Sequence, residues 1–342
     1  RNFTNKIWNA TRFVLSQLRG QEAGGRDQEA GGRGQGTGDR RQGTGDRNQE
    51  PTYQSTNPPT YQPTNLPDRW ILSRLSATVT ECTRLMDGFQ FSEAGRQAYE
   101  FFWSEFCDWY LEISKIALYR GAEADRARAR ATLIKALDDA LRLLHPFIPY
   151  VTEETWGHLK QAAGGAGWPA GLIVAPWPAA GPRDEAAEAD MGLIIEIVRA
   201  IRNARAEQNA PAGQPIAALI AAGARETLLR DQAETICSLA RVDPQRLTIA
   251  GQLAAPPQSL TLVTGAVTTY LPLAGLVDLE AERARLAAEL TETEAQISRS
   301  ESLLAGPFAQ RAPANVVQRE RDKQTELRER AARLAQRLTD LA

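Results

Sequence analysis

The asparagine and arginine residues near the start of the sequence have the side chains and the spacing to bind a nucleic acid. Asn2, Asn5, Asn9 and Arg12 recur every three or four residues, with Lys6 adjacent, so in a helix they share one face. Amide and guanidinium groups hydrogen-bond to base edges and phosphates. Each asparagine costs a helix up to about 0.7 kcal/mol against alanine. The alternative is that these amides bond to neighbouring loops of the protein itself.

Two further basic sets have the same chemistry. Arg199, Arg202, Asn203 and Arg205 follow one another with no acid before Glu207, and guanidinium groups present forked donors that suit phosphate. The third set lies near the end of the sequence: Arg319, Arg321, Lys323, Arg328 and Arg330. This last set either pairs with acids of the preceding helix or leaves a basic edge for phosphate. Because the net charge is −2, any nucleic-acid contact must come from such local patches.

The residues that could support catalysis are few. His145 and His158 have no neighbouring Ser or Cys nucleophile, and Glu105, Asp108 and Glu112 lie at i, i+3 and i+7. These carboxylates could act as an acid–base pair, but a solvated or arginine-paired helix face is the better explanation. There is no Gly-Lys-Ser/Thr phosphate loop and no metal-ligand spacing. We expect no active site and no metal site.

The cysteines and the hydropathy pattern indicate the compartment. Cys82, Cys107 and Cys237 are far apart and form no CxxC pair, which suits a reducing cytoplasm and argues against zinc. No apolar run approaches the roughly 18 residues of a membrane span, so we expect no membrane contact. The sequence starts at Arg1 within a helical pattern, which indicates a piece of a longer protein.

The elements that must position these residues are mostly helices. Residues 2–18 read as an amphipathic helix, and residues 21–48 are four seven-residue units from QEAGGRD to QGTGDRN, followed by PTYQSTN and PTYQPTN. Gly- and Pro-rich repeats without apolar positions cannot offset the entropy of ordering. We therefore predict a disordered insertion that serves as a linker and does not contact RNA.

The remaining pattern predicts a mainly α fold. Apolar stripes indicate helices from an N-cap at Pro67-Asp68 to Gly88, at 92–119 and 125–144, a short helix from Thr152 to Trp156, and a helix at 186–208, with a short β segment at 172–174. A small α/β unit follows, with strands near 216–220, 247–250, 260–264 and 267–272 and a helix near 225–240. From Asp278 the spacing of leucines predicts an antiparallel coiled-coil hairpin, with Thr293 and Ser300 as weak seam positions.

The sequence thus divides into five parts. We expect the first helix of an antiparallel bundle at 1–19, the insertion at 20–66, the rest of the bundle at 67–210, the α/β subdomain at 211–277 and the coiled-coil arm at 278–342.

Several strings resemble class Ia aminoacyl-tRNA synthetases, and the valyl family in particular. They are RNFTNKIWNATRFVL (1–15), DRWILSRL (68–75), FFWSEFCDWYLEISK (101–115), LHPFIPYVTEETW (144–156), APWP (175–178), IRNARAEQNAPAGQPI (201–216) and LLAGPFAQRAPANVVQRER (303–321). They stand in the family's order and together span nearly the whole chain except 20–66.

The resemblance implies an anticodon-binding bundle and an arm that reaches the outer corner of tRNA. The family charges valine-accepting tRNA with valine, using ATP and Mg²⁺, and edits mischarged threonine. The His-x-Gly-His and Lys-Met-Ser-Lys-Ser signatures and the editing domain are missing from this sequence. We therefore expect a catalytically inactive, monomeric tRNA-binding chain that holds no cofactor and whose partner, besides tRNA, is the missing N-terminal catalytic portion.

Two rival interpretations stay open. The first is the equivalent part of an isoleucyl or leucyl enzyme, although isoleucyl enzymes often end in a cysteine-bound zinc module that three scattered cysteines cannot form. The second is a free-standing RNA-binding or coiled-coil interaction protein.

Overall fold

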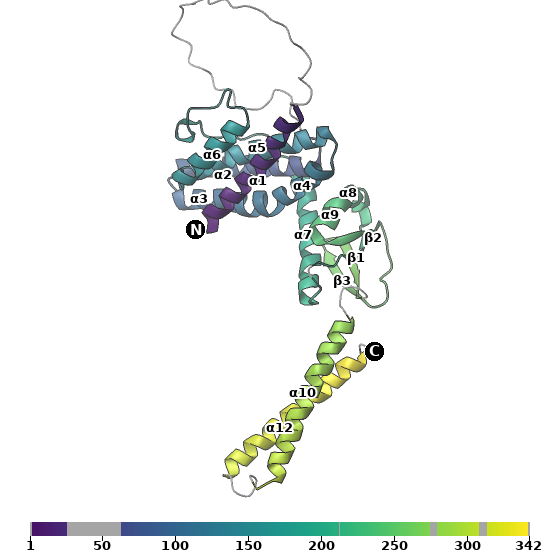
Figure 1. Ribbon diagram of the computed structural model, residues 1–342. Coiled ribbons are helices and arrows are strands. Elements are labelled where there is room, and N and C mark those ends of the chain that lie inside the picture. The colour runs from purple at the N-terminus through teal and green to yellow at the C-terminus, as the bar shows by residue number, and fades with distance from the viewer. Residues whose placement is uncertain (1, 26–62, 212, 274–278, 308–312, 341–342) are drawn as a thin grey trace, which may run out of the picture. The chain divides into compact units, whose positions relative to one another are not determined.

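The computed structural model describes the backbone of residues 2–25 and 63–340, except for residues 212, 274–278 and 308–312 (Figure 1). The described residues form two compact units. The first contains the residues up to Glu196 together with Glu234–Leu239. The second contains Ile197–Ala233 and the residues from Ala240 onward.

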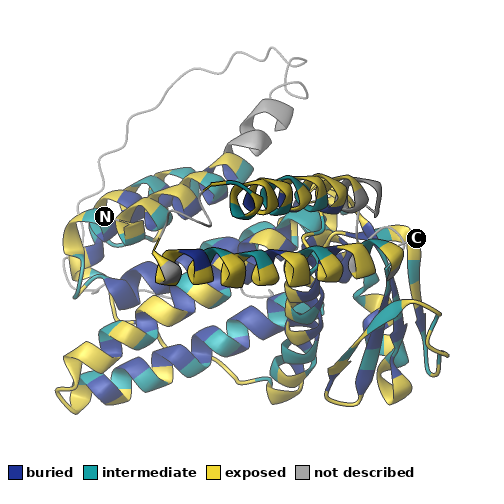
Figure 2. Cartoon of the chain, turned by 90° about the horizontal axis from the view of Figure 1, so that it is seen from below, coloured by how far each residue is buried: buried dark blue, intermediate teal, exposed yellow. Residues whose placement is uncertain are grey.

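The first unit is a helical bundle, which confirms the predicted mainly α fold. Its helices carry a buried stripe along one side and exposed residues along the other (Figure 2). On α5, the leucines that recur every three or four residues, Leu133, Leu137, Leu141 and Leu144, are all buried. The elements are α1 (Asn2–Gly25), α2 (Leu66–Asp87), α3 (Phe91–Glu100), η1 (Phe101–Tyr110), α4 (Leu111–Arg120), α5 (Glu123–Leu144), α6 (Pro149–Ala162), η2 (Leu172–Val174) and the first half of α7 (Glu185–Glu207).

The start of the bundle differs from the prediction at two points. Helix α1 continues to Gly25, past the predicted boundary at residue 19, and the predicted insertion otherwise lies mostly outside the described residues. Helix α2 is capped by Asn65 and not by Pro67-Asp68, because the Asn65 side chain accepts a hydrogen bond from the Asp68 amide at 2.9 Å. Pro67 occupies the first turn, where no amide is needed.

The helix predicted at 92–119 is divided by a π-helical segment. Residues Phe101–Tyr110 have π geometry between two α-helical stretches. The rings of Phe102, Phe106 and Tyr110 follow one another along it with centroids 5.7 and 6.2 Å apart. The apolar pattern could not reveal this, since α and π backbones both place every fourth residue on much the same face. The Tyr110 hydroxyl donates to the buried Asp68 carboxylate at 2.6 Å, which gives that carboxylate a partner in the core.

The β segment predicted at 172–174 is wrong, because these residues form the 3₁₀ turn η2. The amides of Leu172 and Ile173 donate to the Glu153 carboxylate at 2.8 and 3.1 Å. A side chain, and not a neighbouring strand, therefore satisfies this backbone.

The second unit contains the predicted α/β subdomain. Strands β1 (Ile216–Ala221), β2 (Val242–Ala250), β3 (Ser259–Thr264) and β4 (Val267–Pro272) form one mixed sheet in the order β2-β1-β4-β3. Strands β1 and β2 are parallel and therefore need a crossover, which contains α8 (Glu226–Asp231) and α9 (Ala233–Ala240). Most of α9, Glu234–Leu239, belongs to the first unit. The single helix predicted at 225–240 is thus divided at Gln232, and β2 begins earlier than predicted.

The arm consists of α10 (Leu279–Ala305) and α12 (Ala314–Asp340), which lie against each other (Figure 1). Its seam is buried every seven residues on α10, at Leu286, Thr293 and Ser300, and at Val317, Leu327 and Leu334 on α12. Ser300 donates to the Glu320 carboxylate at 2.8 Å across the hairpin. The predicted coiled-coil hairpin is confirmed, including its two polar seam positions.

Candidate nucleic-acid interface

The face of α1 opposite its buried stripe is exposed, as the sequence predicts. Ile7, Ala10 and Val14 anchor the helix in the bundle. A helix fixed in this way turns the other side to solvent, and that side carries Asn2, Asn5, Asn9 and Arg12. Amide donors and acceptors therefore stand beside a cation on one solvent-facing strip, the α1 polar face.

Trp8 extends this face with an aromatic ring. Its side chain is 39% exposed, and its ring meets that of His158 edge to face at 5.9 Å. A half-exposed ring beside amides and a cation offers a stacking surface to a nucleobase. Helical periodicity missed Trp8 because it places tryptophan with the core.

A second aromatic group lies near the other end of α1. Tyr119 on α4 is 63% exposed, and the Gln17 amide donates to its hydroxyl at 3.4 Å and to Ser16 at 3.1 Å. The Lys115 ammonium lies 5.5 Å from the Phe13 ring centroid. This group comes from helices a hundred residues apart in sequence, so local spacing gave no signal of it.

Lys6 lies in a different environment from its neighbours on α1. Its ammonium forms an ion pair with Asp108 at 2.5 Å and lies 3.7 Å from the centroid of the Trp103 ring. These contacts fix α1 against η1. The charge of Lys6 is therefore engaged within the bundle, and a phosphate would have to compete with Asp108 for it.

The three carboxylates considered as catalytic candidates are all in ion pairs. Glu105 accepts two hydrogen bonds from the Arg74 guanidinium at 2.8 and 2.9 Å. Asp108 pairs with Lys6, and Glu112 with Lys115 at 2.7 Å. The expectation of a paired helix face is confirmed.

The histidines and cysteines have structural surroundings. His145 bonds through Nδ1 to the Thr152 hydroxyl at 2.8 Å, and His158 lies 3.3 Å from Glu154. Burial raises the pKa of the Cys82 thiol to about 11 and that of Cys107 to about 12, so neither is a thiolate at neutral pH. In the described part of the chain, no three His, Cys, Asp or Glu side chains gather as a metal site, and no helix is long and apolar enough to cross a membrane.

The basic strip on α7 is divided between the surface and the interior. Arg199, Arg202 and Asn203 are exposed, whereas Arg205 is buried. The Arg205 guanidinium donates to the backbone oxygens of Arg241, Pro211 and Gln214 at 3.0–3.2 Å. Burial lowers the pKa of Arg205, but its donors are directed at carbonyls and hold the start of the α/β subdomain.

The bases of the arm divide in a similar way. Arg328 pairs with Glu301 at 2.7 Å and Arg330 with Glu289 at 2.6 Å, both across the hairpin. Arg319, Arg321 and Lys323 are exposed on α12, and no ion pair between described residues includes them. The inter-arm pairing that the sequence left open therefore applies to Arg328 and Arg330.

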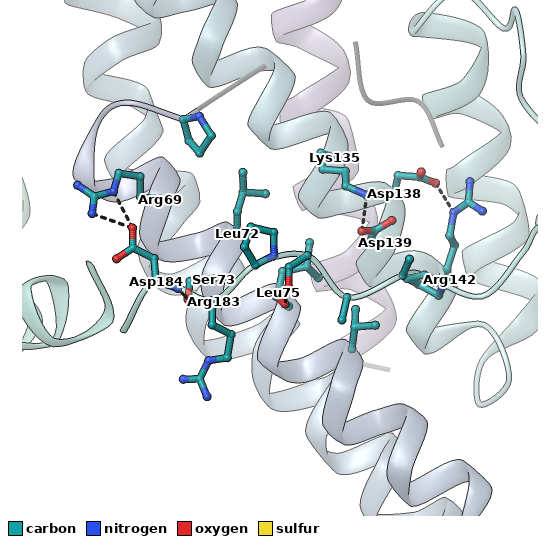
Figure 3. Close-up of a pocket in the computed structure, with 18 of the residues that line it drawn as sticks. Arg69, Leu72, Ser73, Leu75, Lys135, Asp138, Asp139, Arg142, Arg183 and Asp184 are labelled. Atoms are coloured by element: carbon teal, nitrogen blue, oxygen red, sulfur yellow. Dashed lines mark hydrogen bonds and ion pairs between the residues drawn. The ribbon is translucent and has the colours of Figure 1, made fainter. Parts of the chain in front are cut away.

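A cavity of about 960 Å³ lies within the first unit, between α2, α5 and the extended segment 176–184 (Figure 3). Arg69 pairs with Asp184 at 2.7 Å and Lys135 with Asp139 at 2.8 Å. Arg142 pairs with Asp138 at 2.9 Å, and Arg183 with Glu188. Burial raises the pKa of Asp139. Every charged side chain labelled in Figure 3 is thus in an ion pair. The Arg69–Asp184 pair and a hydrogen bond from Arg142 to the Pro176 oxygen at 3.0 Å hold the extended segment on the bundle.

Two protein-family models match the chain, one over the helical bundle and one over the arm. The family model described as the anticodon-binding domain of tRNA ligase matches residues 68–220, and the model described as the valyl tRNA synthetase tRNA binding arm matches residues 278–342. The first covers most of the bundle, and the second covers the coiled-coil hairpin.

Curated relatives match 99% of the chain. Valine--tRNA ligases from Enterococcus faecalis, Geobacillus stearothermophilus and Bacillus subtilis are 36%, 35% and 32% identical to it. The chain spans about a third of their length, 35% in each case. With both family models and the relatives in agreement, the chain belongs to the valine–tRNA ligase family, of which it carries the anticodon-binding domain and the tRNA-binding arm.

Proposed function

We propose that this chain is the tRNA-binding part of a valine–tRNA ligase and that it holds valine-accepting tRNA by two surfaces that share no residue. One surface is on the bundle and the other on the arm. The attachment of valine with ATP and Mg²⁺, and the editing of mischarged threonine, belong in this proposal to a catalytic portion outside this chain. The exposed Arg199, Arg202 and Asn203 of α7 form a third candidate strip.

The observation that carries the proposal is the α1 polar face. It presents Asn5, Asn9 and Arg12 to solvent beside the half-exposed Trp8 ring. Amides can read base edges, and stacking on an aromatic ring contributes about 1–3 kcal/mol per base. This combination suits the unpaired bases of an anticodon loop, since single-stranded RNA is recognised mainly through stacking and base edges.

The arm acts through charge. Arg319, Arg321 and Lys323 stand on α12 as exposed cations, whereas Arg328 and Arg330 are neutralised by acids of α10. Cations of this kind contact phosphates, which position a nucleic acid without reporting its sequence. The arm therefore adds affinity, and the bundle adds discrimination.

We further propose that the chain acts as a monomer in the cytoplasm and that it has the five parts that the sequence predicts, with the first helix extended from residue 19 to Gly25. Both candidate surfaces lie within one chain, so tRNA binding requires no second copy.

Filter binding with valine tRNA and a non-cognate tRNA tests the proposal. Removal of residues 279–342 should weaken both complexes by similar factors. Asn5→Ala, Asn9→Ala and Arg12→Ala combined should weaken the valine tRNA complex more than the other. Arg96→Ala, which removes an exposed arginine that pairs with Glu93 and Glu100, serves as the control. If the α1 variant binds both tRNAs as the unaltered chain does, the bundle surface has been placed wrongly.

A further inference from the structure

The turn between α2 and α3 exposes two aromatic rings that touch each other. Phe89 is 81% exposed and Phe91 50%, and their rings meet edge to face with centroids 6.1 Å apart. Single exposed apolar residues are common on protein surfaces. Two large rings in contact at one turn form a small apolar surface that folding leaves in water.

The backbone conformation at this turn is unfavourable for a phenylalanine at position 89. Phe89 has φ of +55° at the end of α2. Its amide donates to Met86 at 3.0 Å, and the Gln90 amide donates to Leu85 at 2.8 Å, as in a Schellman helix end. Glycine is the usual residue at this position, because a Cβ is strained at positive φ. Phe89 therefore strains the turn and gains little burial in return.

The charges around the two rings oppose a nucleic acid. The charged side chains nearest in sequence on α2 and α3 are four carboxylates and two guanidinium groups: Glu81, Arg84, Asp87, Glu93, Arg96 and Glu100. Both arginines are occupied, Arg84 by Glu81 at 2.6 Å and Arg96 by Glu93 and Glu100 at 2.7 and 2.8 Å. An acidic surround repels phosphate, so the rings suit a polypeptide and not tRNA.

We propose that the α2–α3 turn is the docking surface for the portion of a valine–tRNA ligase that this chain does not contain. The proposal rests on the proposed function, in which this chain works with such a portion. The relatives leave about two thirds of their length without a counterpart here, since the chain covers 35% of them. The occupant presents an apolar recess for Phe89 and Phe91 and a basic rim that faces Asp87.

The probe is the part of the Enterococcus faecalis relative that lies outside the alignment with this chain, produced as a separate polypeptide. Hydrogen exchange of the chain should slow at residues 86–92 when the probe is added. Phe89→Ala with Phe91→Ala should weaken the complex at least tenfold by titration calorimetry. Ile173→Ala, at a 77% exposed apolar position of the same unit, should change it less than twofold.

Three outcomes overturn the docking surface: no complex with the probe, protection elsewhere with the turn unchanged, or equal binding by the double variant. Binding of valine tRNA is measured on the same samples. Its loss in the double variant would make the turn an RNA contact and also overturn the proposal. If the unaltered chain does not bind tRNA, the proposed function is refuted instead, so the two failures are distinguishable.

A second variant tests whether Phe89 is retained for binding and not for folding. Phe89→Gly relieves the positive φ and removes the ring. It should raise Tm by about 2–4 °C, the shift expected for relief of one strained residue in a unit of this size, while it weakens the complex with the probe. A lower Tm would show that Phe89 stabilises the bundle.

Discussion

Replacement of Arg319, Arg321 and Lys323 by alanine should flatten the salt dependence of tRNA binding, and replacement of Arg328 and Arg330 should not. All five residues are bases of α12. They differ in their surroundings, because the first three are exposed and the last two form ion pairs with Glu301 and Glu289 across the hairpin. The comparison therefore holds the helix and the sign of the charge constant and changes the pairing.

The magnitude follows from counterion release. Each phosphate contact that is lost reduces the slope of log affinity against log salt by about 0.7–0.9, so three contacts reduce it by about 2.1–2.7. Between about 200 and 50 mM salt, a fourfold change, the unaltered chain should gain roughly 20–40 times more affinity than the triple variant. The Arg328 and Arg330 variant should keep a slope within about 0.5 of the original, since each pair already has its charge compensated.

Filter binding over this salt range measures both slopes, and circular dichroism melts of the variants control for the stability of the arm. The Arg328 and Arg330 variant should have a slightly lower melting temperature, because exposed ion pairs contribute about 0–1 kcal/mol each. Equal slopes for the two variants would refute the reasoning, since ion pairing within the hairpin would then have no bearing on phosphate contact.

Three further predictions concern the rest of the chain. Arg205→Ala should lower the free energy of unfolding by about 2–4 kcal/mol in urea denaturation, because three backbone carbonyls lose the donor that the buried guanidinium supplies. An exposed control, Arg246→Ala, should change it by less than about 0.5 kcal/mol. Replacement of residues 26–62 by a short Gly-Ser linker should leave Tm within a few degrees of the original, since loop closure costs only about 0.6 kcal/mol per doubling of length; a larger drop would give these residues a structural role. The isolated chain should show no valine-dependent pyrophosphate exchange above background, and measurable exchange would contradict the assignment of catalysis to another portion.

The elements of this fold were predictable where side-chain periodicity is strong. The buried leucines of α5 and the seam of the arm lie at the positions that the spacing predicts. Prediction failed where one long-range contact decides the local structure. Glu153 satisfies the amides of Leu172 and Ile173 from nineteen and twenty residues away and thereby makes a 3₁₀ turn out of an apparent strand. The π geometry of η1 leaves the apolar pattern almost unchanged, so periodicity could not reveal it.

The candidate interface was predictable in its residue types but not in its pairing. The sequence shows that Arg199, Arg202 and Arg205 are close together, yet only the fold shows that Arg205 points into the interior and bonds to carbonyls. Lys6 likewise belongs to the polar stretch of α1, but its partner Asp108 comes from a helix 102 residues further along. The position of a side chain around its helix predicts whether it is exposed. Its hydrogen-bond or ion-pair partner depends on which helices pack together in the fold.

The separation of the two surfaces has a consequence for their individual strengths. When two binding modules share one chain, engagement of the first gives the second a high effective concentration, and the combined affinity can exceed either by about 10²–10⁴. Neither the α1 polar face, with one arginine and a few amides, nor the three exposed bases of α12 then needs to bind tightly by itself. Removal of the arm should therefore reduce the affinity for valine tRNA and for non-cognate tRNA by the same factor, since both tRNAs present the same phosphates. Under the proposed function, we therefore expect discrimination to come from the bundle, where the amides of Asn5 and Asn9 can distinguish base edges.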